Sequence, residues 1–125
     1  MKDGTMKNGS RNRFVAIQIA MAFMFLGAVQ AAFAETVFVK YRGPVDLKPF
    51  ACQWTGRSSF IERLCYDKKE HYVLVNLKGT YYHYCGIPES VVNDWLGAPS
   101  MGQYYNQNVK GSYDCRVTPP PSYRE

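Results

Sequence analysis

Four cysteines constrain the fold of this 125-residue chain more than any other feature, and they are Cys52, Cys65, Cys85 and Cys115. Structural zinc sites take cysteines in pairs that lie two to four residues apart, and no two cysteines here are so close. We therefore expect no metal site and no cofactor. An even number of cysteines in a small exported protein is typical of disulfides. The sequence predicts two disulfides if the chain is exported.

The first 34 residues predict that export, because they have the three parts of a secretory signal peptide. Their basic start holds four residues: Lys2, Lys7, Arg11 and Arg13. An apolar run over 14–29 follows, and Ala32 and Ala34 frame a cleavage site. A spanning helix needs roughly 20 apolar residues, so we favour cleavage after Ala34 over an uncleaved membrane anchor. No second apolar run follows, so we expect a periplasmic or secreted domain with no stable membrane insertion after cleavage.

Removal of the signal peptide changes the charge of the protein. The whole chain has a net charge of +5, but its first 34 residues hold four basic side chains and one acidic side chain. The remainder therefore carries a net charge of +2. Nucleic-acid-binding domains usually carry a marked basic excess, so the predicted mature chain is a poor candidate for that class.

The pattern of the mature chain predicts a small α+β domain over 57–117 with less regular segments on both sides. Breaks at Gly43, Pro44 and Pro49 predict an irregular arm over 35–56. Strand-like runs at 59–66, 71–77 and 80–85 are joined by short polar turns. The sequence therefore predicts a three-stranded antiparallel meander, with a tight turn at Lys78 and Gly79.

Helical patterns follow the third predicted strand. Pro88 and Glu89 suit a helix start, and Val91 with Trp95 makes an i,i+4 apolar pair on one face. Ser100, with Gln103 three residues later, predicts the start of a second short helix. The proline-rich residues 118–125 predict an extended and mobile tail.

Four cysteines allow three pairings, and position in the chain favours one of them. A bond between Cys65 and Cys85 would tie the first predicted strand to the end of the third. A bond between Cys52 and Cys115 would then hold the N-terminal arm against the tail. We predict this pairing.

The third predicted strand carries the clearest binding signal. Side chains alternate across a strand, so Tyr82 and Tyr84 share one face, while Tyr81, His83 and Cys85 share the other. Tyrosine rings stack well on sugars or bases, although the same rings can simply form a core. The candidate ligand-binding residues are therefore these: Arg57, Tyr82, Tyr84, Tyr104, Tyr105, Asn106 and Lys110.

No sequence motif supports an enzyme. His71 and His83 lie in no catalytic motif, and a Cys–His nucleophile would need a free thiol at Cys85. No glycine-rich phosphate loop is present. We therefore expect no catalytic residues.

Three stretches of the chain resemble the KTSC domain, a family named for its occurrence at the C-terminus of some lysyl-tRNA synthetases. These stretches are RSSFIERLCYD at Arg57 to Asp67, YHY at Tyr82 to Tyr84, and CGIPESVVNDWLGAPSMGQYYNQNVKG at Cys85 to Gly111. The resemblance implies a small α+β fold and a suggested role in RNA binding. The signal peptide, the low mature charge and the cysteines depart from that pattern and argue against RNA.

These observations favour a non-enzymatic binding module outside the cytoplasm, with a cell-envelope protein or polymer as its candidate partner. The resemblance supports a second hypothesis, a nucleic-acid-binding domain. The third and least supported hypothesis is an enzyme that acts on cell-envelope polymers.

Overall fold

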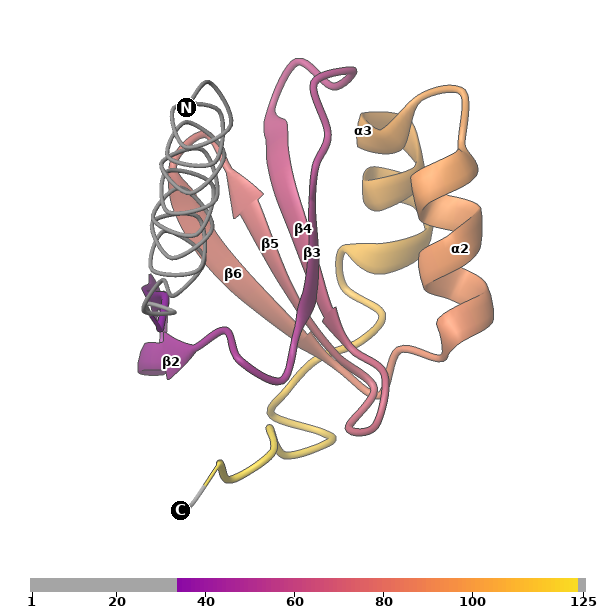
Figure 1. Ribbon diagram of the computed structural model, residues 1–125. Helices are drawn as coiled ribbons and strands as arrows, with labels where there is room; N and C mark the ends of the chain where they lie inside the picture. The colour runs from indigo at the N-terminus through magenta and orange to yellow at the C-terminus, as the bar shows by residue number, and fades with distance from the viewer. Residues whose placement is uncertain (1–33, 124–125) are drawn as a thin grey trace, which may run out of the picture. The chain divides into compact units, whose positions relative to one another are not determined.

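One mixed β-sheet organises the part of the chain that the structure, a computed structural model, describes, residues 34–123. The sheet has six strands in the order β2-β1-β6-β5-β4-β3 (Figure 1). The strands are β1 Thr36–Val39, β2 Gly43–Asp46, β3 Ala51–Trp54, β4 Ile61–Asp67, β5 Tyr72–Leu77 and β6 Thr80–Cys85. The helices are α2 Glu89–Gly97, α3 Met101–Tyr104 and the π-helix η1 Tyr105–Val109. Except for Ala34, the predicted signal peptide lies outside the described residues.

Strands β4, β5 and β6 follow the sequence pattern closely and pair in chain order, each antiparallel to the next. Leu77 pairs with Thr80 across a two-residue turn. Lys78 and Gly79 both have positive φ angles, 52° and 92°, which is the geometry that tight hairpin turns require. The predicted turn is therefore present.

The predicted three-stranded sheet was wrong, because the arm over 35–56 adds three more strands. β1 pairs antiparallel with β2 and parallel with β6, while β3 pairs antiparallel with β4. Gly43 has a φ of 108° and follows the tight turn after β1. Pro44 lies in the edge strand β2, where a missing N–H is tolerated. The glycine and proline that were interpreted as breaks thus form a hairpin.

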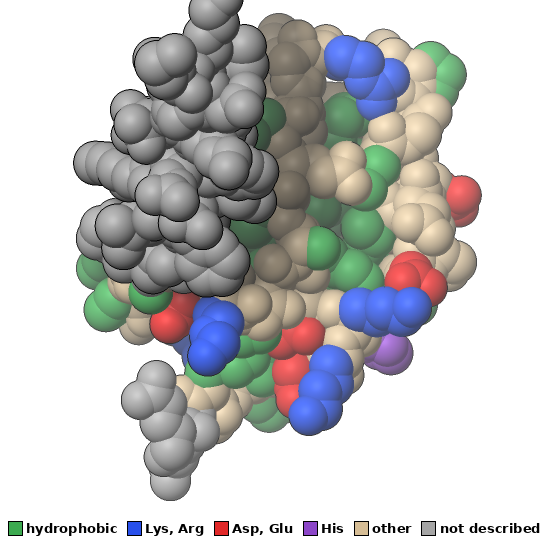
Figure 2. All heavy atoms as spheres, viewed as in Figure 1, with side chains coloured by type: hydrophobic (Ala, Val, Ile, Leu, Met, Phe, Trp, Pro, Cys, Tyr) green, Lys and Arg blue, Asp and Glu red, His purple; other side chains and the backbone are tan. Residues whose placement is uncertain are grey.

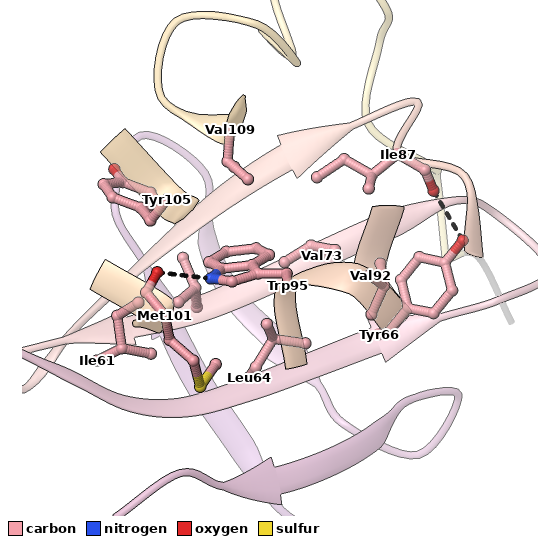
Figure 3. Packing of buried hydrophobic residues seen from close by; sticks show 11 residues of the cluster. Ile61, Leu64, Tyr66, Val73, Ile87, Val92, Trp95, Met101, Tyr105 and Val109 are labelled. Atoms are coloured by element: carbon pink, nitrogen blue, oxygen red, sulfur yellow. Dashed lines mark hydrogen bonds between the residues drawn. The ribbon is translucent and has the colours of Figure 1, made fainter. Parts of the chain in front are cut away.

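The first core lies between the sheet and the helices, which cover one face of β4 and β5 (Figure 1). Trp95 is fully buried near its centre, stacks on Tyr105, and donates from Nε1 to the carbonyl of Met101 at 3.1 Å (Figure 3). The Ser100 hydroxyl accepts from the N–H of Gln103 at 3.2 Å. The predicted start of the second helix is therefore confirmed.

The second core lies on the opposite face of the sheet. It is made of β-strand side chains and of residues from the connection between β2 and β3, and its buried members are Val39, Val45, Leu47, Cys65, Tyr72, Leu74, Tyr81 and Cys85. Phe50 and Tyr123 pack against it with their rings 5.8 Å apart. The Tyr123 hydroxyl donates to Asp67 at 2.6 Å. The tail up to residue 123 is therefore held against the sheet by Tyr123. The mobility predicted for residues 118–125 stays a prediction.

The structure forms two disulfides, but the predicted pairing was wrong. Cys52 bonds to Cys65, and Cys85 bonds to Cys115. Cys52 and Cys65 lie directly opposite each other on β3 and β4, with Cα atoms 4.0 Å apart. This pairing depends on strand β3, which the sequence pattern did not predict.

The two disulfides indicate an oxidising location outside the cytoplasm. Within residues 34–123, no helix has the length and apolar character that crossing a membrane requires.

Candidate functional site

A surface pocket of about 560 Å³ lies along β6. Strand β6 supplies three consecutive residues of its lining, Tyr82, His83 and Tyr84. Tyr41 contributes from the turn after β1, and the remaining lining residues come from the segment after η1: Gly111, Asp114, Cys115 and Arg116. The pocket is thus built by one strand and two segments that lie far from each other in the sequence.

The pocket lies where the backbone edge of β6 is only partly covered. Lys40 donates its N–H to the carbonyl of Tyr81 at 2.8 Å, and Cys85 donates its N–H to the carbonyl of Tyr113 at 3.0 Å. His83 lies midway between these two paired positions. The disulfide between Cys85 and Cys115 holds the segment after η1, which forms the second wall of the pocket, beside the strand.

Tyr82 and Tyr84 are half-buried, and both pack against the first core. The Tyr84 hydroxyl lies 2.5 Å from the Tyr105 hydroxyl, and burial together with this hydrogen bond raises the pKa of Tyr84. Tyr82 lies under the ammonium of Lys40, which is 5.5 Å from the ring centroid. Because the Tyr84 hydroxyl bonds within the protein, Tyr82 is the better placed of the two to bind a ligand through its hydroxyl.

The remaining side chains of the pocket differ in exposure and charge. Tyr41 is 83% exposed, so its ring can stack against a ligand at little cost in stability. Asp114 and Arg116 form a two-pronged ion pair, with Nη2 and Oδ2 2.6 Å apart. The hydrogen bonds from Arg116 hold the pKa of Asp114 at about 2. This pair is therefore electrically neutral at physiological pH.

His83 points its ring to the opposite face of the sheet from Tyr82 and Tyr84, as strand alternation predicts. Its Nδ1 lies 2.8 Å from the Tyr72 hydroxyl. Burial, with a contribution from Arg42, lowers the pKa of His83, so the ring is neutral at pH 7. The ring therefore packs against Tyr72, a buried residue of the second core.

The structure brings only part of the predicted site together. Tyr82 and Tyr84 line the pocket, and Tyr105 supports it from the core through its bond to Tyr84. The other four predicted residues do not line it: Arg57, Tyr104, Asn106 and Lys110. Arg57 instead donates to the carbonyl of Leu96 at 2.6 Å.

The candidates chosen from the sequence did not include Tyr41, Asp114 or Arg116, which the structure places in the pocket lining. The bond between Cys85 and Cys115 would have placed Asp114 and Arg116 beside the third predicted strand, but the pairing chosen from the sequence was different. No local signal marked Tyr41. Within the described part of the chain, no group of three or more His, Cys, Asp or Glu side chains could hold a metal ion.

Comparison with known proteins confirms the resemblance seen in the motifs. Residues 57–113 match the KTSC domain. The chain is 34% identical over 56 residues to a lysine–tRNA ligase of Nostoc punctiforme, a match covering 44% of this chain and 10% of the ligase. The chain thus spans about a tenth of the length of that relative. A KTSC domain protein from Yersinia pestis shares 26% identity with a TM-score of 0.47, covering 51% of this chain and 93% of that protein.

Proposed function

Residues 57–113 of the chain form a KTSC domain, and from the pocket on its strand β6 we propose that the protein is a non-enzymatic binding module outside the cytoplasm. The KTSC domain supplies the floor of the pocket, Tyr82 to Tyr84, and one wall residue, Gly111. Tyr41, Asp114 and Arg116 lie outside residues 57–113. The proposed site therefore depends on segments that this chain adds to the domain.

The aromatic lining of the pocket is the observation that carries this proposal. Three tyrosines face one cavity of about 560 Å³, a size within the range of small-molecule sites. Tyrosine combines a flat apolar face with a polar hydroxyl. Such a lining favours a small polar ligand with at least one flat or apolar face.

The chemistry around the pocket gives little support to catalysis. Cys85 is bonded to Cys115, so it offers no thiolate beside His83. The His83 Nδ1 already interacts with Tyr72. The Tyr84 hydroxyl is likewise hydrogen-bonded within the protein, to the Tyr105 hydroxyl. These internal bonds favour a rigid binding surface.

The charge distribution favours a small ligand over a nucleic acid. On the face shown in Figure 2, Lys and Arg side chains lie beside Asp and Glu side chains rather than in one basic patch. Affinity for nucleic acid rises with the number of phosphates that basic side chains neutralise. The low net charge of the predicted mature chain therefore supports binding of a small molecule or a short segment.

An NMR screen of the disulfide-bonded protein tests the proposal. The panel contains methyl glycosides, nucleosides, oligouridine and short peptides, each followed through amide shifts of ¹⁵N-labelled protein. We expect at least one compound to shift residues 41, 82–84 and 111–116 together. Shifts elsewhere for every active compound, or no shifts at all, would contradict the proposal.

The variant Tyr41→Ala separates binding from stability. Tyr41 is 83% exposed, so its truncation should change the free energy of unfolding by less than about 0.5 kcal/mol. The same substitution should still lower the affinity of any compound that binds in the pocket. Phe38→Ala is the matched control, because Phe38 is 72% exposed on the adjoining strand β1 and does not line the pocket.

A further inference from the structure

At His83, the outer edge of β6 has no paired strand, and this feature indicates which class of ligand the pocket can bind. In an antiparallel ladder, successive residues direct their N–H and C=O groups alternately to the two sides of the strand. Leu77 and Thr80 close the two-residue turn between β5 and β6, so the backbone groups of Tyr82 and Tyr84 bond to β5. Those of Tyr81, His83 and Cys85 therefore point away from β5, toward β1 and the pocket.

Two of these three outward-facing residues are already paired. Tyr81 accepts from Lys40, and Cys85 donates to Tyr113. Among the described residues, β1 pairs with β6 at Tyr81 alone, and no turn or loop backbone group bonds to the N–H or the C=O of His83 on this side. The pocket lies at this position. A ligand in it therefore meets one free backbone donor and one free backbone acceptor at strand spacing.

A peptide residue satisfies both groups at once. In an antiparallel pair, a residue opposite His83 would donate its N–H to the His83 carbonyl and accept from the His83 N–H. The two neighbouring side chains of the peptide would then lie on the same face as Tyr82 and Tyr84. The aromatic lining thus lies where the flanking side chains of a bound peptide would be.

The segments at both ends of the pocket limit the length of that peptide. Lys40 occupies the edge opposite Tyr81, and Tyr113 occupies it opposite Cys85. These positions on β6 are four residues apart, or about 13 Å at the usual strand rise. An incoming strand therefore has room for about three residues, which suits a free tripeptide or a chain end better than an internal strand.

The charges at the two ends give the direction of binding. At the Tyr82 end, the ammonium of Lys40 lies over the ring, and it has no acidic partner among residues 34–123. At the other end, Asp114 and Arg116 neutralise each other. The excess positive charge therefore favours a carboxylate near Tyr82, which is where the C-terminus of an antiparallel peptide would lie.

We propose that the pocket binds a short peptide or peptide C-terminus as an antiparallel strand, paired with the backbone of His83 and flanked by Tyr82 and Tyr84. This inference rests on the proposed function and names the class of ligand for the same site. Backbone pairing supplies the recognition, so the pocket should tolerate different flanking apolar side chains.

The probe is the tripeptide phenylalanyl-alanyl-phenylalanine with free ends, titrated into the disulfide-bonded protein and followed by amide NMR. We expect saturable shifts at residues 82–84 and 113–116. Methylation of the alanine nitrogen removes the donor to His83 and should weaken binding about tenfold or more. Amidation of the C-terminus should weaken binding roughly twofold to fivefold, as loss of an exposed ion pair does.

Two protein variants test the same contact from the other side. His83→Pro removes the backbone N–H and should weaken binding of the tripeptide. Phe38→Ala, at an exposed position of β1 outside the pocket, should bind the tripeptide as the natural protein does. If His83→Pro does not fold, the N-methylated peptide tests the contact in the natural protein. Equal affinity for the methylated and unmethylated peptides would overturn the strand pairing, and equal affinity for the acid and the amide would overturn the direction.

The outcomes separate this inference from the proposed function. If the tripeptide fails to bind at millimolar concentration while a glycoside or nucleoside shifts residues 82–84, the peptide inference fails and the binding function stands. If no compound of the panel shifts the pocket, both fail.

Discussion

Tyr82 and Tyr84 lie on the same face of one strand, but they differ in what their hydroxyls do. Tyr84 bonds to Tyr105, whose ring in turn stacks on the buried Trp95. Tyr82 has no hydroxyl partner among the described residues, and its ring lies beside Lys40. The first tyrosine of the motif is therefore the one whose hydroxyl is left for a ligand, while the second connects the pocket to the core.

This difference predicts a split between two conservative substitutions. Tyr84→Phe should lower the free energy of unfolding by about 1 kcal/mol, because it leaves the Tyr105 hydroxyl without its partner. Tyr82→Phe should leave the free energy nearly unchanged. Urea denaturation measures both through the shift in midpoint at constant slope. An equal loss of unfolding free energy in the two variants would show that the hydrogen bond to Tyr105 does not stabilise the fold.

At the scale of elements, β6 contributes to both cores and to the pocket. One of its faces enters the first core through Tyr82 and Tyr84, and the other enters the second core through Tyr81 and Cys85. Its outer edge forms the floor of the pocket. The disulfides act on different elements, because Cys52–Cys65 joins β3 to β4, whereas Cys85–Cys115 attaches the segment after η1 to β6.

Removal of each disulfide should therefore have different consequences. By loop entropy, the sequence separations of 13 and 30 residues correspond to about 3 and about 4 kcal/mol of stability. The double variant Cys85→Ala, Cys115→Ala should also lose hydrogen-exchange protection at the amide of Cys85 and lose binding in the pocket. The double variant Cys52→Ala, Cys65→Ala should be destabilised but keep the pocket. Binding that survives in the Cys85→Ala, Cys115→Ala variant would show that the segment after η1 does not need its disulfide to form the pocket.

At the scale of the whole molecule, the two cores share one sheet but are closed by different parts of the chain. The helices close the first core. The second is closed by the connection between β2 and β3 and by Tyr123. Arg42 packs 5.4 Å from the centroid of Tyr123 and donates to the carbonyl of Pro121 at 2.6 Å. Pro121 and Tyr123 thus help to complete the fold.

Truncation of Tyr123 tests this contribution. Tyr123→Ala removes a half-buried ring from Phe50 and Tyr72 and a hydrogen bond from the buried Asp67. We expect a loss of about 2 kcal/mol, or roughly 10 °C in melting temperature for a domain of this size. Ser122→Ala, at an exposed neighbouring position, should have no effect. A melting temperature unchanged by Tyr123→Ala would mean that the tail does not stabilise the fold.

The amino-acid sequence determined the features that depend on neighbouring residues. The alternation of Tyr82 and His83, the turn at Lys78 and Gly79, and the helix start at Ser100 each follow from local backbone geometry. The motifs over 57–113 likewise identified the KTSC domain. In each case the residues that form the feature lie within a few positions of one another or follow one another along the chain as successive motifs.

Only the tertiary structure decided which distant segments meet. The irregular-looking arm became three strands because its short runs of apolar residues gain their partners from β4 and β6. That arrangement placed Cys52 opposite Cys65 and left Cys115 for Cys85. The pocket has the same origin, since Tyr41 and Arg116 meet only across β6. Strand pairing between distant segments is stabilised by packing and hydrogen bonds that no local pattern records, so these contacts could not be predicted from residue order alone.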